Sequence, residues 1–384
     1  MALYLAFKEV WRNRGRFFLF SLVIALITTL VLFIAALSEG LALANRQYLE
    51  KLDAELLIFQ KDVDLSANAS RIELSRLNDI TRLEGVEQVG PIGFGTAKLV
   101  PPDGGEDLNV SIIGVEAGQP GAPQVLAGRG FTGDRGAQAI LDSNVTNRVP
   151  LQVGDQITLK TLQGGEEQLY NLTVVGLTDG QQYLYAPSIF IPYRTWQQIR
   201  PQAGEGSPLV DEVSNVAAVK IKPGQDEEVV KQQILANVRD VEVADIQTAY
   251  ESIPGYSVQQ STLNTQRGFT MLIGILVIGG FFQIQMLQKI PQIGVLKAIG
   301  ASNLTVGAAV VLQIILVTTF GVLLGTLVTL GLAAGIPDSV PIIFNGSSFV
   351  IAILTLLMIG PIGGLITVRL AVRVEPLIAL GLSS

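Results

Sequence analysis

The residues of this 384-residue chain whose types and spacing suit them to act on something else form one short segment, KIPQIGVLKAIGASN, residues Lys289–Asn303. The segment separates two long apolar runs and carries charge at Lys289 and Lys297. A proline in the first turn, apolar residues at helical spacing and a glycine at position 300 predict one short amphipathic helix with its start and its stop. Such a helix is either a simple connector or a surface that binds a partner protein.

Other chemistry is scarce in this sequence. The chain has no Cys and no His, so it offers no thiolate, no disulfide and neither the commonest metal ligand nor the usual general base. It contains no GxxxxGK[ST] phosphate-binding loop. We therefore expect no enzyme and no cofactor bound by this chain. A net charge of −7 gives no support to nucleic-acid binding.

The start of the chain predicts a membrane anchor. Residues 1–16 are basic and loosely amphipathic, as in a cytoplasmic interfacial helix. An uncharged run, Phe17–Leu37, is long enough to cross a hydrocarbon core of about 30 Å. We expect a first transmembrane helix with an outer extension over residues 17–44. The alternative is a secretory signal peptide, although the apolar part of such a peptide is usually only about 7–15 residues long.

Residues 45–266 predict a large α+β domain. A strand–helix–strand order occurs at residues 54–92, where Ser70 is the expected helix cap, and again at residues 214–246. The sequence between them is rich in short alternating runs, and Gly164-Gly165 indicates a hairpin turn. We expect two βαβ units flanking a β-rich insertion, although the two units could also belong to separate lobes.

Three further apolar segments complete a membrane protein with four transmembrane α-helices, one plus three. We expect them at residues 267–287, 304–336 and 347–368. Between and after them lie the short helix at residues 288–303, an outer loop at 337–346 and a tail at 369–384. Eight basic residues against two acidic ones occupy the three segments on the terminal side: Lys8, Arg12, Arg14, Arg16, Lys289, Lys297, Arg369 and Arg373 against Glu9 and Glu375. The positive-inside rule places both termini in the cytoplasm and the large domain outside.

The four spans carry no Asp, Glu, Lys or Arg in their interiors, which disfavours an ion-driven or proton-driven transporter. GxxxG spacings occur at Gly321/Gly325, Gly331/Gly335 and Gly360/Gly364. These permit close contact between helices, either within one bundle or between two copies of the chain.

Three motifs resemble one protein family. They are the basic start FKEVWRNRGRFFLF, the segment QIGVLKAIGAS at Gln292–Ser302 and the ending VRVEPLIAL at residues 372–380. With the one-plus-three spans around an outer domain, they resemble permease subunits of the ABC transporters that include MacB, the LolC/LolE pair and FtsX. Within the group, ANRQYLEKLDAELLIFQKDVDLSANASRIELS is most similar to permeases of the haem-efflux HrtB type, and more loosely to the DevC type.

The resemblance implies a bacterial inner-membrane protein that contacts two ATPase subunits, which bind ATP and magnesium, and a second permease copy. A periplasmic adaptor protein is a further partner in parts of this group. The segment at the cytoplasmic surface would be a coupling helix that docks on the ATPase, with Ile293, Leu296 and Ile299 filling its groove and Lys297 at the rim. The implied coupling residues are Pro291, Gln292, Ile293, Gly294, Val295, Leu296, Lys297, Ala298, Ile299, Gly300 and Ala301.

The resemblance implies export of a hydrophobic or amphiphilic substrate (haem, a lipid, a lipoprotein or a drug-like molecule) from the outer leaflet or the periplasm. Without His or Cys, haem ligation would need Met, Tyr or a carboxylate, and Glu39 and Met271 are candidates at the outer ends of their spans. The alternatives are an FtsX-like regulator that passes ATP-driven motion to a cell-wall hydrolase without transport, and a sensor or assembly scaffold.

Overall fold

The computed structural model of the chain describes residues 11, 14–200, 213–336, 340, 342–344 and 346–373, and it divides into two compact units. The helical unit comprises residues up to Leu41 and from Gln260 onward, and the α/β unit comprises Ala42–Gln259. The interfacial helix expected at residues 1–16, the loop at 337–346 and the tail at 369–384 lie largely outside the described residues.

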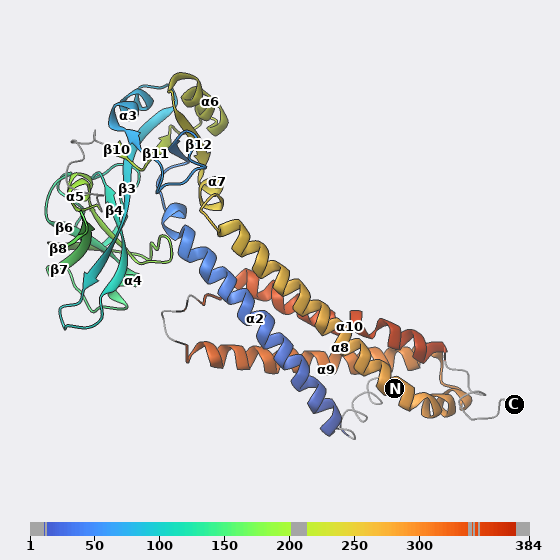
Figure 1. Cartoon of the computed structure of the whole chain (residues 1–384). Helices are drawn as coiled ribbons and strands as arrows, with labels where there is room; N and C mark the ends of the chain where they lie inside the picture. The colour runs from blue at the N-terminus through green and yellow to red at the C-terminus, as the bar shows by residue number, and fades with distance from the viewer. Residues whose placement is uncertain are drawn as a thin grey trace. The chain divides into compact units, whose positions relative to one another are not determined.

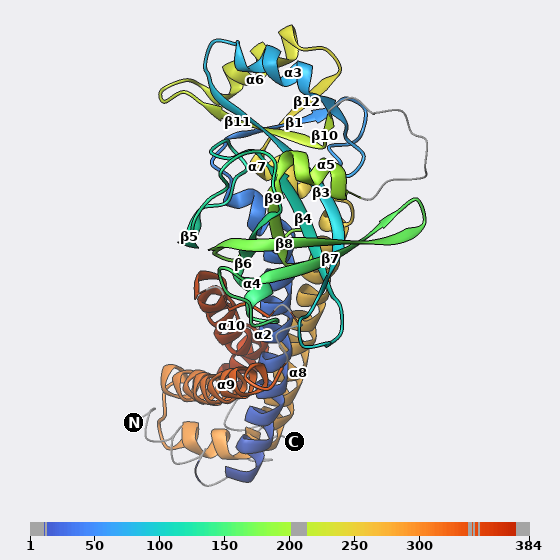
Figure 2. The same cartoon turned by 90° about the vertical axis from the view of Figure 1, so that its left-hand side faces the viewer.

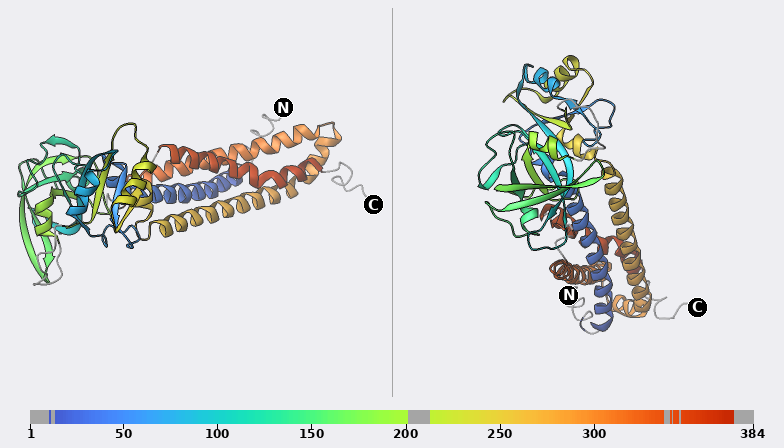
Figure 3. Two further views of the ribbon diagram at one scale, coloured as in Figure 1. Left: turned by 90° about the horizontal axis from the view of Figure 1, so that it is seen from above. Right: turned by 60° about the vertical axis from the view of Figure 1, so that its left-hand side comes forward.

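Four helices of the described chain are long and apolar enough to cross a membrane, in the expected one-plus-three order. They are α2 (Arg14–Glu50), α8 (Tyr256–Ala298), α9 (Asn303–Ala333) and α10 (Gly346–Arg373) (Figures 1 and 3). At 1.5 Å per residue, the 43 residues of α8 extend over about 64 Å, twice the thickness of a hydrocarbon core. Because α2 and α8 extend beyond the expected spans, each contributes residues to both units.

The glycines of two of the three GxxxG spacings lie at helix–helix contacts within this one chain. A Cβ on Gly321 or Gly325 would collide with α2, near Ile24 and Thr28. A Cβ on Gly360 or Gly364 would collide with side chains of α9. These glycines therefore allow α9 to lie against both α2 and α10. A Cβ on Gly331 or Gly335 meets no other helix.

The α/β unit is built on a ten-stranded sheet with the strand order β12-β1-β11-β3-β4-β9-β6-β8-β5, in which β7 pairs with both β3 and β8. Its strands are β1 (Leu56–Gln60), β3 (Val86–Val100), β4 (Leu108–Val115), β5 (Val125–Gly128), β6 (Gln138–Asp142), β7 (Gln156–Gln163), β8 (Glu166–Thr178), β9 (Ser188–Pro192), β11 (Val216–Ile221) and β12 (Val241–Asp245). A separate pair joins β2 (Ile72–Glu73) to β10 (Val213–Ser214). The short helices are α3 (Leu74–Thr81), α4 (Ser143–Thr146), α5 (Tyr193–Ile199), α6 (Glu227–Asn237) and α7 (Ile246–Glu251).

The two expected strand–helix–strand units are present and they interleave. The first is β1–α3–β3 and the second is β11–α6–β12. Strand β1 lies between β12 and β11, and β11 lies between β1 and β3, with antiparallel pairing throughout. The two units thus form one split βαβ sheet rather than separate lobes. One local expectation was wrong: α3 begins after Glu73, and the Ser70 hydroxyl instead accepts a hydrogen bond from the Gln60 amide at 2.8 Å.

Both faces of this sheet are covered. Leu56 and Ile58 of β1 face one core, which contains side chains from α3 and α6. Figures 1 and 2 show these two helices next to each other at the same end of the α/β unit. Leu57 and Phe59 face the opposite core, to which the end of α2 and the region of α7 and the start of α8 contribute. Because side chains alternate along a strand, the five-residue strand β1 contributes side chains to both cores.

The β-rich insertion forms a lobe around its own core. Trp196 of α5 is buried against a cross-strand pair of glycines, Gly93 and Gly114, where any Cβ would collide with the indole. The long β7–β8 hairpin, seen in Figure 2, turns at Gly164-Gly165, where both φ angles are positive as the sequence predicts.

Candidate functional site

The charged segment between the second and third spans is not a separate helix. The sequence predicts that Pro291 begins a helix, but Pro291 lies inside α8, which continues to Ala298. The helix changes direction near this end, as Figures 1 and 2 show. A proline inside a helix removes one hydrogen bond and bends the axis, so a continuous helix with a turned end replaces the expected break.

The end of the segment follows the sequence prediction closely. Gly300 has φ +100°, and two hydrogen bonds close the last turn: the Ala301 amide donates to Leu296 O at 3.0 Å and the Gly300 amide donates to Lys297 O at 3.0 Å. This is a Schellman motif, which requires the left-handed backbone that glycine adopts at least cost. The Ser302 hydroxyl then accepts from the Thr305 amide at 3.2 Å and caps α9. The connection between α8 and α9 is therefore short, and hydrogen bonds close the helix end on each side of it.

The exposed apolar face of this connection differs from the face expected from the sequence. Ile293 is only 8% exposed and packs with Met286, Val306 and Ala371 of its own bundle. Leu296 is half-buried. The exposed apolar side chains of the connection, which we call the docking face, are Val295, Ala298, Ile299 and Leu304, with exposed fractions of 48%, 79% and 84% at Val295, Ile299 and Leu304.

The two lysines of the segment contact their own chain. Lys297 Nζ donates to Val372 O of α10 at 2.7 Å. Lys289 Nζ lies 3.4 Å from Gln313 Oε1 of α9 and 5.8 Å from the centre of the Phe17 ring. A cation in the last turn of α8 also interacts favourably with the helix dipole. Both charges therefore help to fix the bundle around the docking face.

The two residues considered for haem lie on different helices, α2 and α8. Glu39 is partly buried on α2 and has interaction partners of its own. Met271 on α8 is partly buried against the core of the helical bundle, as a packing residue would be. Among the described residues, no group of three or more metal-ligating side chains is present.

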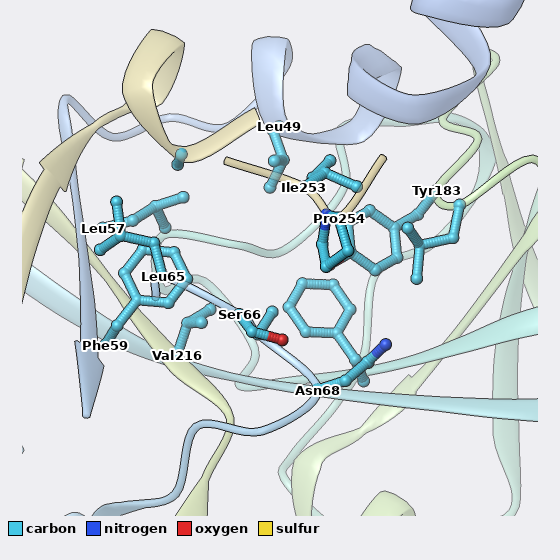
Figure 4. A pocket seen from close by; sticks show the side chains of 14 residues that line it. Leu49, Leu57, Phe59, Leu65, Ser66, Asn68, Tyr183, Val216, Ile253 and Pro254 are labelled. Carbon is cyan, nitrogen blue, oxygen red and sulfur yellow. The ribbon is translucent and has the colours of Figure 1, made fainter. Parts of the chain in front are cut away.

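A pocket inside the α/β unit was not anticipated from the sequence. It lies among the end of α2, strand β1, the loop after β1 and the junction between α7 and α8, and its wall is apolar except for Ser66, Asn68 and the phenol of Tyr183 (Figure 4). Its cavity volume is about 20 Å³, which suffices for one or two water molecules but not for a porphyrin. Burial raises the pKa of the Tyr183 phenol in its wall, so this group stays neutral.

Comparison with known protein families decides what this architecture belongs to. The MacB-like periplasmic core domain matches residues 17–237, and the FtsX-like permease C-terminal domain matches residues 268–376. The chain belongs to the MacB/FtsX-like permease family. It is therefore a multi-pass membrane permease of a MacB/FtsX-type ABC system with an extracytoplasmic domain, and the family implies a separate ATPase partner. Both matched domains are permease domains, in agreement with the expectation that this chain is not itself the ATPase.

The chain is similar to two curated proteins and to one solved structure. The chain is 28% identical over 377 residues to the "Putative hemin transport system permease protein HrtB" of Staphylococcus haemolyticus, covering 98% of this chain and 99% of that protein. It is 31% identical over 134 residues to the macrolide export ATP-binding/permease protein MacB of Pasteurella multocida, covering 32% of this chain and 21% of that protein. The crystal structure of the periplasmic region of MacB from Actinobacillus actinomycetemcomitans aligns with 52% of this chain and 92% of that chain, at 13% identity and a TM-score of 0.38.

Proposed function

We propose that this permease is the membrane subunit of an ATP-driven exporter, that its termini and its α8–α9 connection face the cytoplasm, and that two copies dock on an ATPase dimer. The observation that carries the proposal is the docking face. A short connection between two membrane helices leaves Ile299 and Leu304 about four-fifths exposed, although neither is needed for the packing of the bundle. Exposed apolar patches mark sites that bind proteins or membranes, and we assign this one to a protein partner.

The charge distribution supports the same orientation. The described basic residues nearest this end of the helical unit are Arg14, Arg16, Lys289 and Lys297, followed by Arg369 and Arg373 at the end of α10. Basic residues close to membrane helices accumulate on the cytoplasmic side. An ATPase that uses cytoplasmic ATP would meet the docking face on that side.

Helix continuity supports a mechanical role. One helix, α8, contains both the docking residues Val295 and Ala298 and, at its other end, Tyr256 in the core of the α/β unit. A push at the docking face is thus passed along a single hydrogen-bonded element to the extracytoplasmic domain. The interiors of the spans carry no charged relay that would serve as another energy source.

The substrate class that we propose is a hydrophobic or amphiphilic molecule of the outer leaflet or the periplasm, with hemin as the first candidate. This assignment rests on the relative named for hemin transport, which aligns over almost its full length. Glu39 and Met271 remain the residues to test as hemin contacts. Glu39→Gln and Met271→Leu should each weaken the Soret shift on hemin titration if they are contacts, and an unchanged shift in both variants would remove them.

Docking is tested by changing its exposed apolar centre. Ile299→Asp should abolish co-purification with the ATPase and reduce permease-stimulated ATP hydrolysis at least tenfold, because the charge must be desolvated in the groove of the partner. Ile299→Leu is the matched control and should retain both. Normal stimulated hydrolysis by a correctly inserted Ile299→Asp protein would refute the assigned docking face.

Export is tested separately, in vesicles that contain the permease and its ATPase. ATP-dependent loss of hemin from the donor side supports the proposed exporter. ATP hydrolysis that depends on the docking face, but moves neither hemin nor fluorescent lipid, would instead support the regulator that transmits motion without transport. Neither result changes the conclusion about docking, so the two parts of the proposal can fail independently.

A further inference from the structure

The turn between β8 and β9 has an unusual backbone. Tyr183 and Ala186 form an isolated bridge, in which each amide donates to the other residue's carbonyl, at 3.1 and 3.2 Å. The two central residues, Leu184 and Tyr185, have φ angles of 49° and 64°. A turn with two positive φ angles normally contains Asn-Gly, because a Cβ is strained in this region. Here a leucine and a tyrosine hold the conformation, so the surrounding contacts must fix it.

The turn places Tyr185 in contact with two helices, α2 and α8. Its amide donates to Ala44 O of α2 at 3.2 Å. Its hydroxyl accepts from Asn45 Nδ2 of α2 at 2.6 Å and donates to Gln259 Oε1 of α8 at 2.6 Å. A phenol hydroxyl can donate one hydrogen bond and accept another at the same time, so it can join the side-chain amides of Asn45 and Gln259. We call Asn45, Tyr185 and Gln259 the Tyr185 bridge.

The bridge joins the two helices that carry the chain into and out of the α/β unit. Helix α2 leads into the unit and α8 leads out of it. The pocket of Figure 4 lies beside the bridge, and its wall includes Leu49 of α2, Leu184 of the turn and Ile253 before α8. Side chains facing a void lack packing partners on that side, which lowers the resistance of these helix ends to relative movement. Directed hydrogen bonds at Tyr185 therefore hold the two helices at this place.

We propose that Tyr185 is a positioning residue that fixes the spacing of α2 and α8 within the α/β unit and ties both helices to the β lobe. The inference extends the proposed function, since it assumes that motion arriving along α8 must be shared with α2 and the lobe. When the hydroxyl is absent, the turn can still contact α2 through its backbone, but the two helices move independently.

The spacing is measurable because the chain has no cysteine. Spin labels on the exposed positions of Glu50→Cys and Ser257→Cys report the distance between the two helix ends in the full permease in lipid nanodiscs. Tyr185→Phe should at least double the width of the distance distribution. Tyr170→Phe removes a phenol oxygen from strand β8, outside the bridge, and should leave the width unchanged. Equal widths in the parent and in Tyr185→Phe would overturn the proposal.

A second variant separates positioning from general loosening. Gln259→Ala breaks the α8 arm of the bridge alone and should broaden the distribution as much as Tyr185→Phe does. The double variant should be no broader than either single variant, because both remove the same connection. Additive broadening would show that the two residues act separately and would contradict the bridge.

The functional arm uses hemin as the probe. The number of hemin molecules exported per ATP hydrolysed should fall at least threefold in Tyr185→Phe, with hydrolysis itself unchanged. An unchanged ratio would contradict the role in transmission. If the parent exports no hemin, the substrate assignment fails, while the spin-label distances still judge the bridge.

Discussion

The two ends of helix α8 are built in opposite ways. At its first turn, Tyr256 enters a core shared with Ile253, β1 and the end of α2, so the helix is fixed in its own domain. At its other end, Val295 in the last turn and Ile299, which directly follows the helix, are exposed on the docking face, while Ile293 packs in the bundle core. The comparison teaches that one end is packed within this chain, whereas the other exposes the apolar face that we propose docks on the ATPase. Mutations should therefore divide into those that unfold the protein and those that only uncouple it.

The largest effect is expected from a charged residue at the first end of α8, compared with the same charge at the other end in Ile299→Asp. Ile253→Asp should destabilise the α/β unit by about 3–5 kcal/mol, because an unpaired carboxylate enters an apolar core. In a Trp11→Phe background, fluorescence of the buried Trp196 follows denaturant unfolding of this unit. Ile253→Asp with the parent's unfolding midpoint would show that the first end of α8 is not held by its core.

A smaller loss is expected from the one docking-segment residue that faces inward. Ile293→Ala should lower bundle stability by about 2–4 kcal/mol through lost burial and the cavity left behind. It should nevertheless retain ATPase binding, which Ile299→Asp loses. Thermal loss of helicity in detergent measures the first effect and co-purification measures the second. Loss of binding with unchanged stability would restore Ile293 to the face first expected from the sequence.

A smaller loss of stability is expected when the anchoring of α2 in the α/β unit is weakened. The buried Tyr48 hydroxyl donates to Gly121 O at 3.0 Å. Tyr48→Phe leaves that buried carbonyl without this donor and should cost about 1–2 kcal/mol. Trp196 fluorescence in denaturant measures the change. An equal effect of the control Tyr170→Phe would indicate a general consequence of removing a phenol oxygen from this unit.

A weaker effect, dependent on pH, is expected within the β lobe, away from both ends of α8. Asp142 is fully buried and accepts hydrogen bonds from the backbone amides of Ser188, at 3.0 Å, and Asn144. Burial raises the pKa of Asp142 despite these bonds. Between its unfolded and native pKa values the native state binds more protons, so stability falls as pH rises through this window. Asp142→Asn should remove this slope from Trp196-detected unfolding curves, and a slope that persists would assign it to another group.

Ile299→Asp should have the smallest effect on stability, within about 0.5 kcal/mol, because the side chain is exposed. Its loss of ATPase coupling should nevertheless be complete. Circular dichroism melts of this variant and the parent should coincide. A large shift in the melt would mean that the docking face also supports the bundle, and the contrast between the two ends of α8 would weaken.

Local signals predicted much of this molecule. The apolar runs indicated four spans, Gly300 indicated the end of α8, and Gly164-Gly165 indicated the hairpin. The prediction that Pro291 begins a helix was wrong, because α8 continues through this residue despite the preference of proline for a first turn. Whether a helix continues through a proline depends on the packing around that proline, and a local sequence pattern does not report this packing.

Long-range contacts were beyond the reach of the sequence. Ile293 is buried because Ala371, far along the chain, lies against it. Tyr185 joins residues that are 140 and 74 positions away, through a turn whose Leu-Tyr centre gives no turn signal. The amphipathic pattern of the docking segment identified an apolar surface correctly, but the bundle determines which side of it remains exposed.

The position of β1 in its sheet has a consequence for biogenesis. This strand is made immediately after α2, yet both its neighbours, β11 and β12, are more than 150 residues later, as the pairs Leu56↔Val219 and Leu56↔Asp245 show. During synthesis, the apolar strand therefore emerges outside the membrane with both edges unpaired until β11 has been translocated, and one edge stays unpaired until β12 follows. Such a delay exposes a segment prone to aggregation. Chaperones of the outer compartment should thus bind nascent chains that stop before β11 and release those that extend past β12.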